Sequence, residues 1–133
     1  MRKPRLLLAD DHEDLLGEVT SLLQEEFEVV GAVRDGATLV KIAVDLNPDV
    51  VVTDFKMPGL SGIEAGYVLL EQRLCKAVVL LTMYANRELV DGAQKAGIQG
   101  FVLKVTAGKD LIPAIHRALR GEVFVSSFDA HPV

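Results

Sequence analysis

Five short apolar runs recur along the chain. They cover residues 5–9 (RLLLA), 28–33 (EVVGAV), 49–53 (DVVVT), 77–82 (AVVLLT) and 100–104 (GFVLK). Four of them lack the apolar–polar alternation of a strand that keeps one face in water. Continuous apolar runs of this length are typical of strands covered on both faces, as in a parallel sheet, although periodicity alone does not distinguish them from pieces of buried helix.

Between these runs the apolar positions recur at helical spacing. Amphipathic helices are therefore predicted over residues 12–26, 36–46, 62–74, 86–96 and 109–120. Pro113 fits the last helix if that helix begins near Lys109 or Asp110, because the missing N–H of proline then falls in the first turn.

Strand–helix pairs in strict alternation predict an α/β fold, namely an open, doubly wound domain with a five-stranded parallel sheet and helices on both faces. A chain of 133 residues is expected to form one such domain with a substantial core. We expect this domain to span residues 1–121. Residues 122–133 would follow as a C-terminal tail or the start of a linker.

Composition excludes several classes of protein. The net charge is −5 and no Lys/Arg cluster occurs, so direct binding of nucleic acid by this chain is not expected. Cys75 is the only cysteine, which excludes a disulfide or a cysteine metal site within one chain and suits a reducing compartment. The apolar run near the N-terminus is too short for a signal peptide, and no 18-residue apolar stretch occurs, so a cytoplasmic protein without a membrane segment is expected.

Polar residues follow four of the apolar runs. Asp10 and Asp11 follow the first run, Asp54 the third, and Thr82 and Lys104 end the fourth and fifth. Because ligands of open parallel sheets bind at the carboxyl ends of the strands, these residues are expected to share one rim.

The chemistry of such a rim favours phosphoryl transfer to an aspartate. Three close carboxylates repel one another unless a cation balances them, and oxygen ligands with room for water suit Mg²⁺. A metal and the Lys104 ammonium would offset charge on a phosphoryl group while the Asp54 carboxylate attacks in line. The turn at Pro58-Gly59 can aim the backbone carbonyl of Lys56 at the metal.

Neighbouring residues fit this rim less well. Arg34 and Asp35 follow the second run and would lie apart if that strand is at an edge of the sheet. His12 stands next to the acidic pair, but it is more typical of a surface residue in the first turn of a helix than of a metal ligand.

The motifs LLLADDHEDL, VVTDFKMPGLSGIEA, VVLLTMY and GIQGFVLK together resemble the receiver domain of two-component response regulators. The resemblance covers about residues 4–121 and implies a flavodoxin-like strand order of 2-1-3-4-5. It also implies a role for each motif residue: phosphoacceptor (Asp54), Mg²⁺ ligands (Asp10, Asp11, Asp54 and the Lys56 carbonyl), phosphoryl-binding residues (Thr82, Lys104) and a switch pair (Thr82, Phe101).

Four residues in or near the site depart from the common pattern. Lys56 adds a second cation. Met83 follows Thr82 where many receivers have a small residue, and Tyr84 comes next. We expect Met83 and Tyr84 to restrict the access of water to the phosphoryl group, while Lys56 could help or hinder. Val105 stands where several subfamilies have proline after the lysine.

The segment at 105–126 is similar to the end of receivers of the NarL/LuxR class, which continue into a helix-turn-helix domain. The resemblance implies a signalling protein that accepts its phosphoryl group from a sensor histidine kinase, controls transcription through a DNA-binding domain absent from this chain, and forms a homodimer on phosphorylation. The chain would be part of a longer regulator or a stand-alone receiver.

Three other interpretations of these residues remain open. A small Mg²⁺-dependent phosphohydrolase of the haloacid-dehalogenase type uses the same residue types, but its Asp-x-Asp motif on the first strand is absent. A flavodoxin-like cofactor binder would need a Gly-rich phosphate loop after the first strand. A degenerate receiver used as a scaffold would not need the complete rim.

Overall fold

The computed structural model describes residues 2–127. Its strands are β1 (Arg5–Ala9), β2 (Glu28–Val33), β3 (Val50–Asp54), β4 (Ala77–Thr82), β5 (Gly100–Leu103) and β6 (Phe124–Val125). Its helices are α1 (Glu13–Leu23), α2 (Gly36–Leu46), α3 (Gly62–Glu71), α4 (Arg87–Lys95), the 3₁₀ helix η1 (Lys104–Thr106) and α5 (Ala107–Leu119). Each apolar run of the sequence forms a strand, and each segment of helical periodicity forms a helix.

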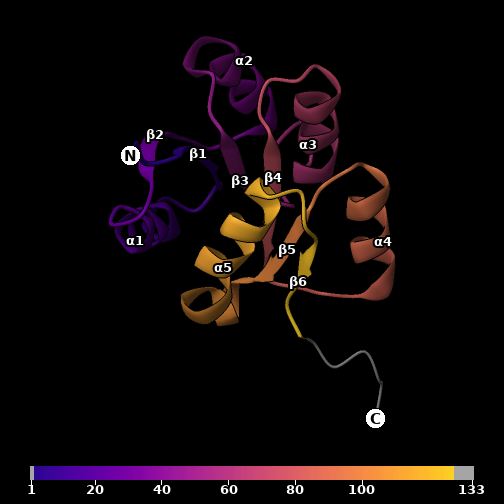
Figure 1. Ribbon diagram of the computed structural model, residues 1–133. Helices are drawn as coiled ribbons and strands as arrows, with labels where there is room; N and C mark the ends of the chain where they lie inside the picture. Colours follow the sequence, from indigo (N-terminus) through magenta and orange to yellow (C-terminus); the bar gives the residue numbers. More distant parts are fainter. Residues whose placement is uncertain (1, 128–133) are drawn as a thin grey trace.

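The strands form one parallel sheet in the order β2-β1-β3-β4-β5-β6 (Figure 1). The predicted α/β fold and the order of its first five strands are confirmed. The sheet has six strands instead of five, because the start of the predicted tail adds β6 beside β5, with Phe124 opposite Gly100 and Val125 opposite Phe101. Residues 128–133 of that tail lie outside the described part of the chain.

Helices cover both faces of the sheet and bury a separate core on each face (Figure 1). On one face α1 and α5 pack against the sheet through aliphatic residues such as Leu23 and Leu111. On the other face α2, α3 and α4 pack through residues such as Leu39, Leu69 and Val90. Since both faces are covered, every residue of β3 and β4 is buried, which explains the unbroken apolar runs of these strands.

The edge strand β2 is different, because most of its residues are only partly buried. It pairs with β1 with an irregularity in register between Leu6 and Leu7. A side chain at Gly31 would crowd Leu7 and Leu46, so this edge accommodates a close approach of the backbone to its neighbours.

The last helix begins earlier than the sequence indicates. α5 starts at Ala107, directly after η1, so Pro113 lies inside the helix and not in its first turn. The expectation of a start near Lys109 was wrong because the 3₁₀ turn after β5 begins the winding before the amphipathic pattern is visible. Pro113 and Lys109, whose carbonyl the missing N–H of Pro113 leaves without its helical partner, are both exposed residues.

Among residues 2–127, no helix combines the length and apolar character that crossing a bilayer requires.

Candidate functional site

The carboxyl ends of the central strands bring four polar side chains together out of water. Asp54 ends β3, Asp10 follows β1, Thr82 ends β4 and Lys104 follows β5. Asp10, Asp54 and Thr82 are each no more than 5% exposed. Buried polar groups need partners, so the cluster is held by its mutual contacts or by a ligand.

Lys104 connects the carboxylates of two different strands. Its Nζ lies 2.8 Å from Asp10 Oδ2 and 3.1 Å from Asp54 Oδ2, and its side chain is only 6% exposed. Burial by itself lowers the pKa of Lys104, but the contacts with Asp10 and Asp54 outweigh burial and raise this pKa above its usual value. The ammonium is therefore charged at neutral pH, as expected from the sequence.

The surroundings of Asp54, unlike those of Lys104, disfavour the charged form of the side chain. Burial and the negative charge of Asp10 raise the pKa of Asp54, although Lys104 and the Phe55 N–H oppose the shift. A positive charge that approaches such a carboxylate stabilises its ionised form.

The acidic pair is incompletely satisfied by the protein. Asp10 Oδ2 and Asp11 Oδ1 are buried oxygens without a hydrogen bond of good geometry, even though Lys104 and His12 nitrogens lie near them. Oxygens of Asp10, Asp11 and Asp54 and a nitrogen of His12 all lie within 4.8 Å of one another, a spacing that a single metal ion could bridge. The donor set, mostly carboxylate oxygen with negative charge exceeding that of one ammonium, fits a hard divalent cation.

His12 lies closer to the acids than the sequence suggests. It is the N-cap residue of α1 and not part of the first turn. Its ring Nδ1 lies 3.1 Å from Asp10 Oδ1 and 3.0 Å from Asp11 Oδ1, while the backbone N–H of His12 donates to Asp10 Oδ1 at 2.9 Å. The side chain is 68% exposed, so the surface location is confirmed, but the contact with the acidic pair was not foreseen.

The acids open into a cleft that contains the remaining expected residues. Its lining includes Asp54, Thr82 and Lys104, together with Lys56, Met83 and Tyr84. Met83 and Tyr84 are 54% and 74% exposed, so they stand at the mouth of the cleft. The Thr82 hydroxyl accepts a 3.4 Å hydrogen bond from the Tyr84 N–H, which places this hydroxyl at the cleft wall.

The loop after Asp54 is held by two glycines with different functions. Gly59 has φ of 76°, the left-handed conformation that the predicted Pro-Gly turn requires. At Gly62 a Cβ would lie 2.0 Å from the Asp54 carbonyl oxygen, so only glycine allows α3 to approach the end of β3 this closely. The capping box of Ser61 and Glu64 then begins α3.

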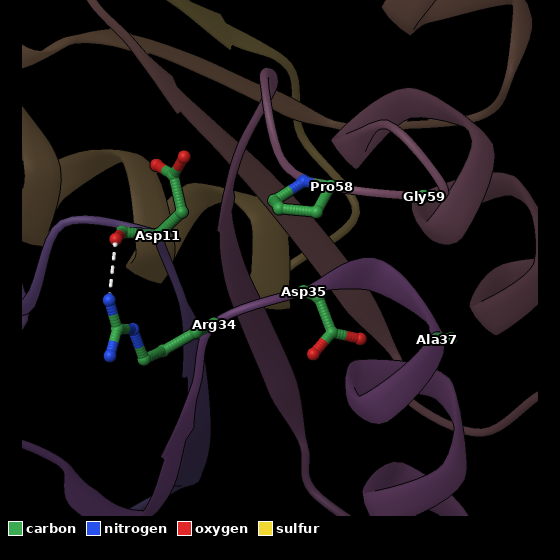
Figure 2. A pocket seen from close by; sticks show the side chains of 6 residues that line it. All are labelled: Asp11, Arg34, Asp35, Ala37, Pro58 and Gly59. Carbon is green, nitrogen blue, oxygen red and sulfur yellow. Dashed lines mark hydrogen bonds between the residues drawn. The ribbon is translucent and has the colours of Figure 1, made fainter.

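A second, open pocket lies beside Asp11, between the loops that follow β2 and β3 (Figure 2). Arg34 reaches across it to donate a 3.4 Å hydrogen bond to the backbone carbonyl of Asp11. β2 is an edge strand as considered, yet Arg34 does not lie apart from the site. Asp35 has a local function, because its carboxylate accepts from the Thr38 N–H at 2.8 Å and caps α2.

Phe101 lies apart from the cleft. It is 2% exposed and packs in the core beneath α2, α3 and α4, with Val125 of β6 beside it. The structure thus brings together the acids, Lys104, Thr82 and the residues of the cleft mouth, and leaves Phe101 in the adjoining core.

The part of the chain that contains the site matches a known protein family. The family model described as the response regulator receiver domain matches residues 6–116. The transcriptional regulatory protein PdtaR of Mycobacterium tuberculosis is 36% identical over 116 residues, which cover 86% of this chain and 56% of PdtaR. The nitrate/nitrite response regulator protein NarL of Escherichia coli is 34% identical over 123 residues, covering 91% of this chain and 57% of NarL.

Solved structures agree with the fold. A two-component response regulator of the LuxR family from Aurantimonas superposes with a TM-score of 0.86 at 27% identity, covering 93% of this chain and 90% of that one. The non-phosphorylated receiver domain of the stress response regulator RcsB from Escherichia coli superposes with a TM-score of 0.85 at 27% identity, covering 95% of this chain and all of that domain.

These matches confirm the predicted NarL/LuxR class and give no support to the haloacid-dehalogenase alternative. The chain spans somewhat more than half the length of the curated relatives it matches.

Proposed function

The chain belongs to the response regulator receiver family, and we propose that it accepts a phosphoryl group on Asp54 and passes this event on as a change of conformation. In this proposal the receiver domain spans residues 1–121, and residues 122–133 are a C-terminal tail or the start of a linker to an output domain, of which Phe124–Val125 pair with the sheet as β6.

The transfer step places Asp54 as the nucleophile. A carboxylate oxygen of Asp54 attacks the phosphorus atom of a phosphohistidine or a small phosphodonor, the bond from phosphorus to the donor breaks, and the leaving group keeps the electron pair. Lys104, already paired with Asp54, neutralises negative charge on the phosphoryl oxygens, and the Thr82 hydroxyl donates to one of them.

Asp10, Asp11, Asp54 and the backbone carbonyl of Lys56 would hold Mg²⁺. When bound, the ion offsets the negative charge that accumulates on the phosphoryl oxygens during transfer. The incompletely satisfied oxygens of Asp10 and Asp11 support this assignment.

One observation carries the proposal: Lys104 Nζ lies within 3.1 Å of carboxylate oxygens of both Asp10 and Asp54, which come from strands far apart in the sequence. An ion pair that served only to stabilise the fold would need one carboxylate beside Lys104, and here there are two. The second acid gives the site its excess negative charge and its affinity for a cation.

Phosphorylation then changes the surface of the domain. It adds close to two negative charges at Asp54, and Thr82 and Phe101 are the residues that would respond. The phosphodonor is a sensor histidine kinase, and the output is transcription through a helix-turn-helix domain of a longer protein, with a homodimer formed on phosphorylation. The transcriptional regulators among the relatives support the assignment of this output. In this proposal the protein functions in the cytoplasm.

The test is formation of an acyl phosphate. Incubation with Mg²⁺ and acetyl phosphate should add one phosphoryl group per chain, acid-stable and base-labile, detected by intact-mass spectrometry. Asp54→Asn should abolish the adduct, whereas Asp45→Asn, a matched change at an exposed aspartate of α2, should leave it intact.

A Thr82→Ala variant separates acceptance from signalling, because it should still take up phosphate but lose much of the change at the α4–β5–α5 surface. An adduct that persists in Asp54→Asn, or rapid turnover of many phosphate esters by the parent chain, would exclude the proposed function.

A further inference from the structure

The segment that follows α5 is anchored to β5 by main-chain and side-chain bonds. The Phe124 N–H donates to the Gln99 carbonyl at 3.0 Å, and the Ser126 N–H donates to the Phe101 carbonyl at 2.8 Å. The Ser126 side chain turns inward and is 2% exposed. The residue after the two-residue strand thus adds a buried serine to the contacts that hold this segment on β5.

The Ser126 hydroxyl joins a buried polar network. It donates to Asp110 Oδ2 at 2.7 Å and accepts from the Leu103 N–H at 3.1 Å. Thr106 Oγ1 donates to the same Asp110 oxygen at 2.8 Å. Asp110, itself 9% exposed, thus links the C-terminal segment to the turn at the end of β5.

That turn carries Lys104. Leu103 precedes it directly, and Thr106 lies two residues after it in η1, so residues on both sides of Lys104 take part in the network of Asp110 and Ser126. Because η1 is only three residues long and has one hydrogen bond of its own, from the Ala107 N–H to the Lys104 carbonyl, contacts of this kind add to what holds its conformation.

The same segment also covers Phe101. Val125 stands opposite Phe101 in the parallel pairing of β5 and β6, and both side chains belong to the core on the α2–α4 face. Docking of the segment therefore contacts Phe101 at its side chain and at its carbonyl.

We propose that docking of residues 124–126 on β5 and phosphoryl binding at Asp54 favour one another, with Asp110 as the positioning residue that connects them through the Lys104 turn. The inference rests on the proposed function of Asp54. When the segment is docked, the network holds the turn so that Lys104 reaches the Asp54 carboxylate; when it is released, the turn loses two of its fixed points.

Thermodynamic linkage makes the effect reciprocal. If docking strengthens phosphoryl binding, then phosphoryl binding strengthens docking by the same factor. The C-terminal segment would consequently report the state of Asp54 to whatever follows residue 127.

The test uses two adjacent serines. Ser126→Ala removes the buried hydroxyl and leaves the Leu103 N–H and Asp110 each without one partner, whereas Ser127→Ala changes an exposed neighbour. Beryllofluoride with Mg²⁺ serves as the probe of phosphoryl binding. Ser126→Ala and Asp110→Asn should weaken its binding by about 5-fold or more, and Ser127→Ala should bind as the parent does.

A second measurement does not depend on phosphoryl binding. Without any probe, the backbone amide resonances of Lys104 and Thr106 should shift, and the Ser126 amide should exchange faster, in Asp110→Asn relative to Ser127→Ala. Beryllofluoride should slow exchange of the Ser126 amide in the parent protein.

The outcomes are distinguishable. If the parent protein does not bind beryllofluoride, the proposed function fails, and unshifted Lys104 and Thr106 amides in Asp110→Asn would overturn the positioning role as well. If the parent binds it and Ser126→Ala binds equally tightly with folded spectra, the coupling is overturned while the proposed function stands.

Discussion

Asp54 and Asp110 are both buried aspartates, but their surroundings are opposite. Asp54 faces another carboxylate across a shared ammonium, and burial together with Asp10 raises its pKa. Burial would also raise the pKa of Asp110, but hydroxyl hydrogen bonds from Ser126 and Thr106 and the charge of Lys109 lower it below its usual value. One carboxylate is crowded by negative charge, and the other is satisfied.

This difference separates a reactive site from a structural one. Buried polar groups whose partners are complete stabilise a particular arrangement, whereas buried groups left with excess charge favour the binding of something else. Here the crowded group lines the cleft, and the satisfied group accepts a hydrogen bond from Ser126, the residue that follows β6.

The largest expected effect comes from removing the shared ammonium. Lys104→Met should slow phosphorylation of Asp54 by acetyl phosphate by about 100-fold or more, because the transferred group loses a positioned cation. The rate is measured by intact-mass spectrometry. Lys41→Met, at an exposed lysine of α2, is the control, and a Lys104→Met rate within a few-fold of the parent would show that the ammonium serves structure only.

A direct comparison of the two aspartates should show stability changes of opposite sign. Without metal at neutral pH, Asp54→Asn should raise the free energy of unfolding by on the order of 1 kcal/mol, because it removes a carboxylate whose ionised form the fold disfavours. Asp110→Asn should lower it by about 1 kcal/mol or more, because it weakens two hydrogen bonds to a charged group.

Urea unfolding in EDTA measures both changes, and Asp45→Asn should stay within about 0.5 kcal/mol of the parent. Changes of the same sign in the two variants would contradict the distinction between a crowded and a satisfied carboxylate.

Asp54, unlike a purely structural carboxylate, lines a cleft. The same cleft is lined by Met83 and Tyr84, which stand at its mouth. Met83→Ala and Tyr84→Ala should each shorten the half-life of the acyl phosphate by a few-fold. Intact-mass spectrometry measures the half-life as the loss of the added phosphoryl mass over time. Half-lives equal to that of the parent in both variants would exclude this gating.

The smallest effect concerns pH. In EDTA the Asp54 carboxyl should titrate above, and Asp110 below, the unfolded value of about 3.9. The stability that Asp110 contributes is thus present above that value and lost as pH falls through its lower folded pKa. The destabilisation that ionised Asp54 causes appears as pH rises from the unfolded pKa through the raised folded pKa of Asp54. Carboxyl ¹³C resonances measure both titrations, and the reverse order would contradict the comparison.

Much of the site could be predicted from local sequence. The polar residues after four apolar runs, Asp10, Asp54, Thr82 and Lys104, needed only the rule that parallel strands present their carboxyl ends at one rim. The turn at Gly59 needed only the conformational preference of glycine after proline.

The sequence by itself determined the succession of strands and helices along the chain and the chemistry of the rim, because periodicity and strand ends are local properties. Tertiary structure alone decided that Arg34 reaches Asp11 and that Ser126 meets Asp110. These contacts depend on distances between segments that no local pattern encodes. A two-residue strand such as β6 has too little periodicity to be seen, and it exists because β5 offers it an unpaired edge.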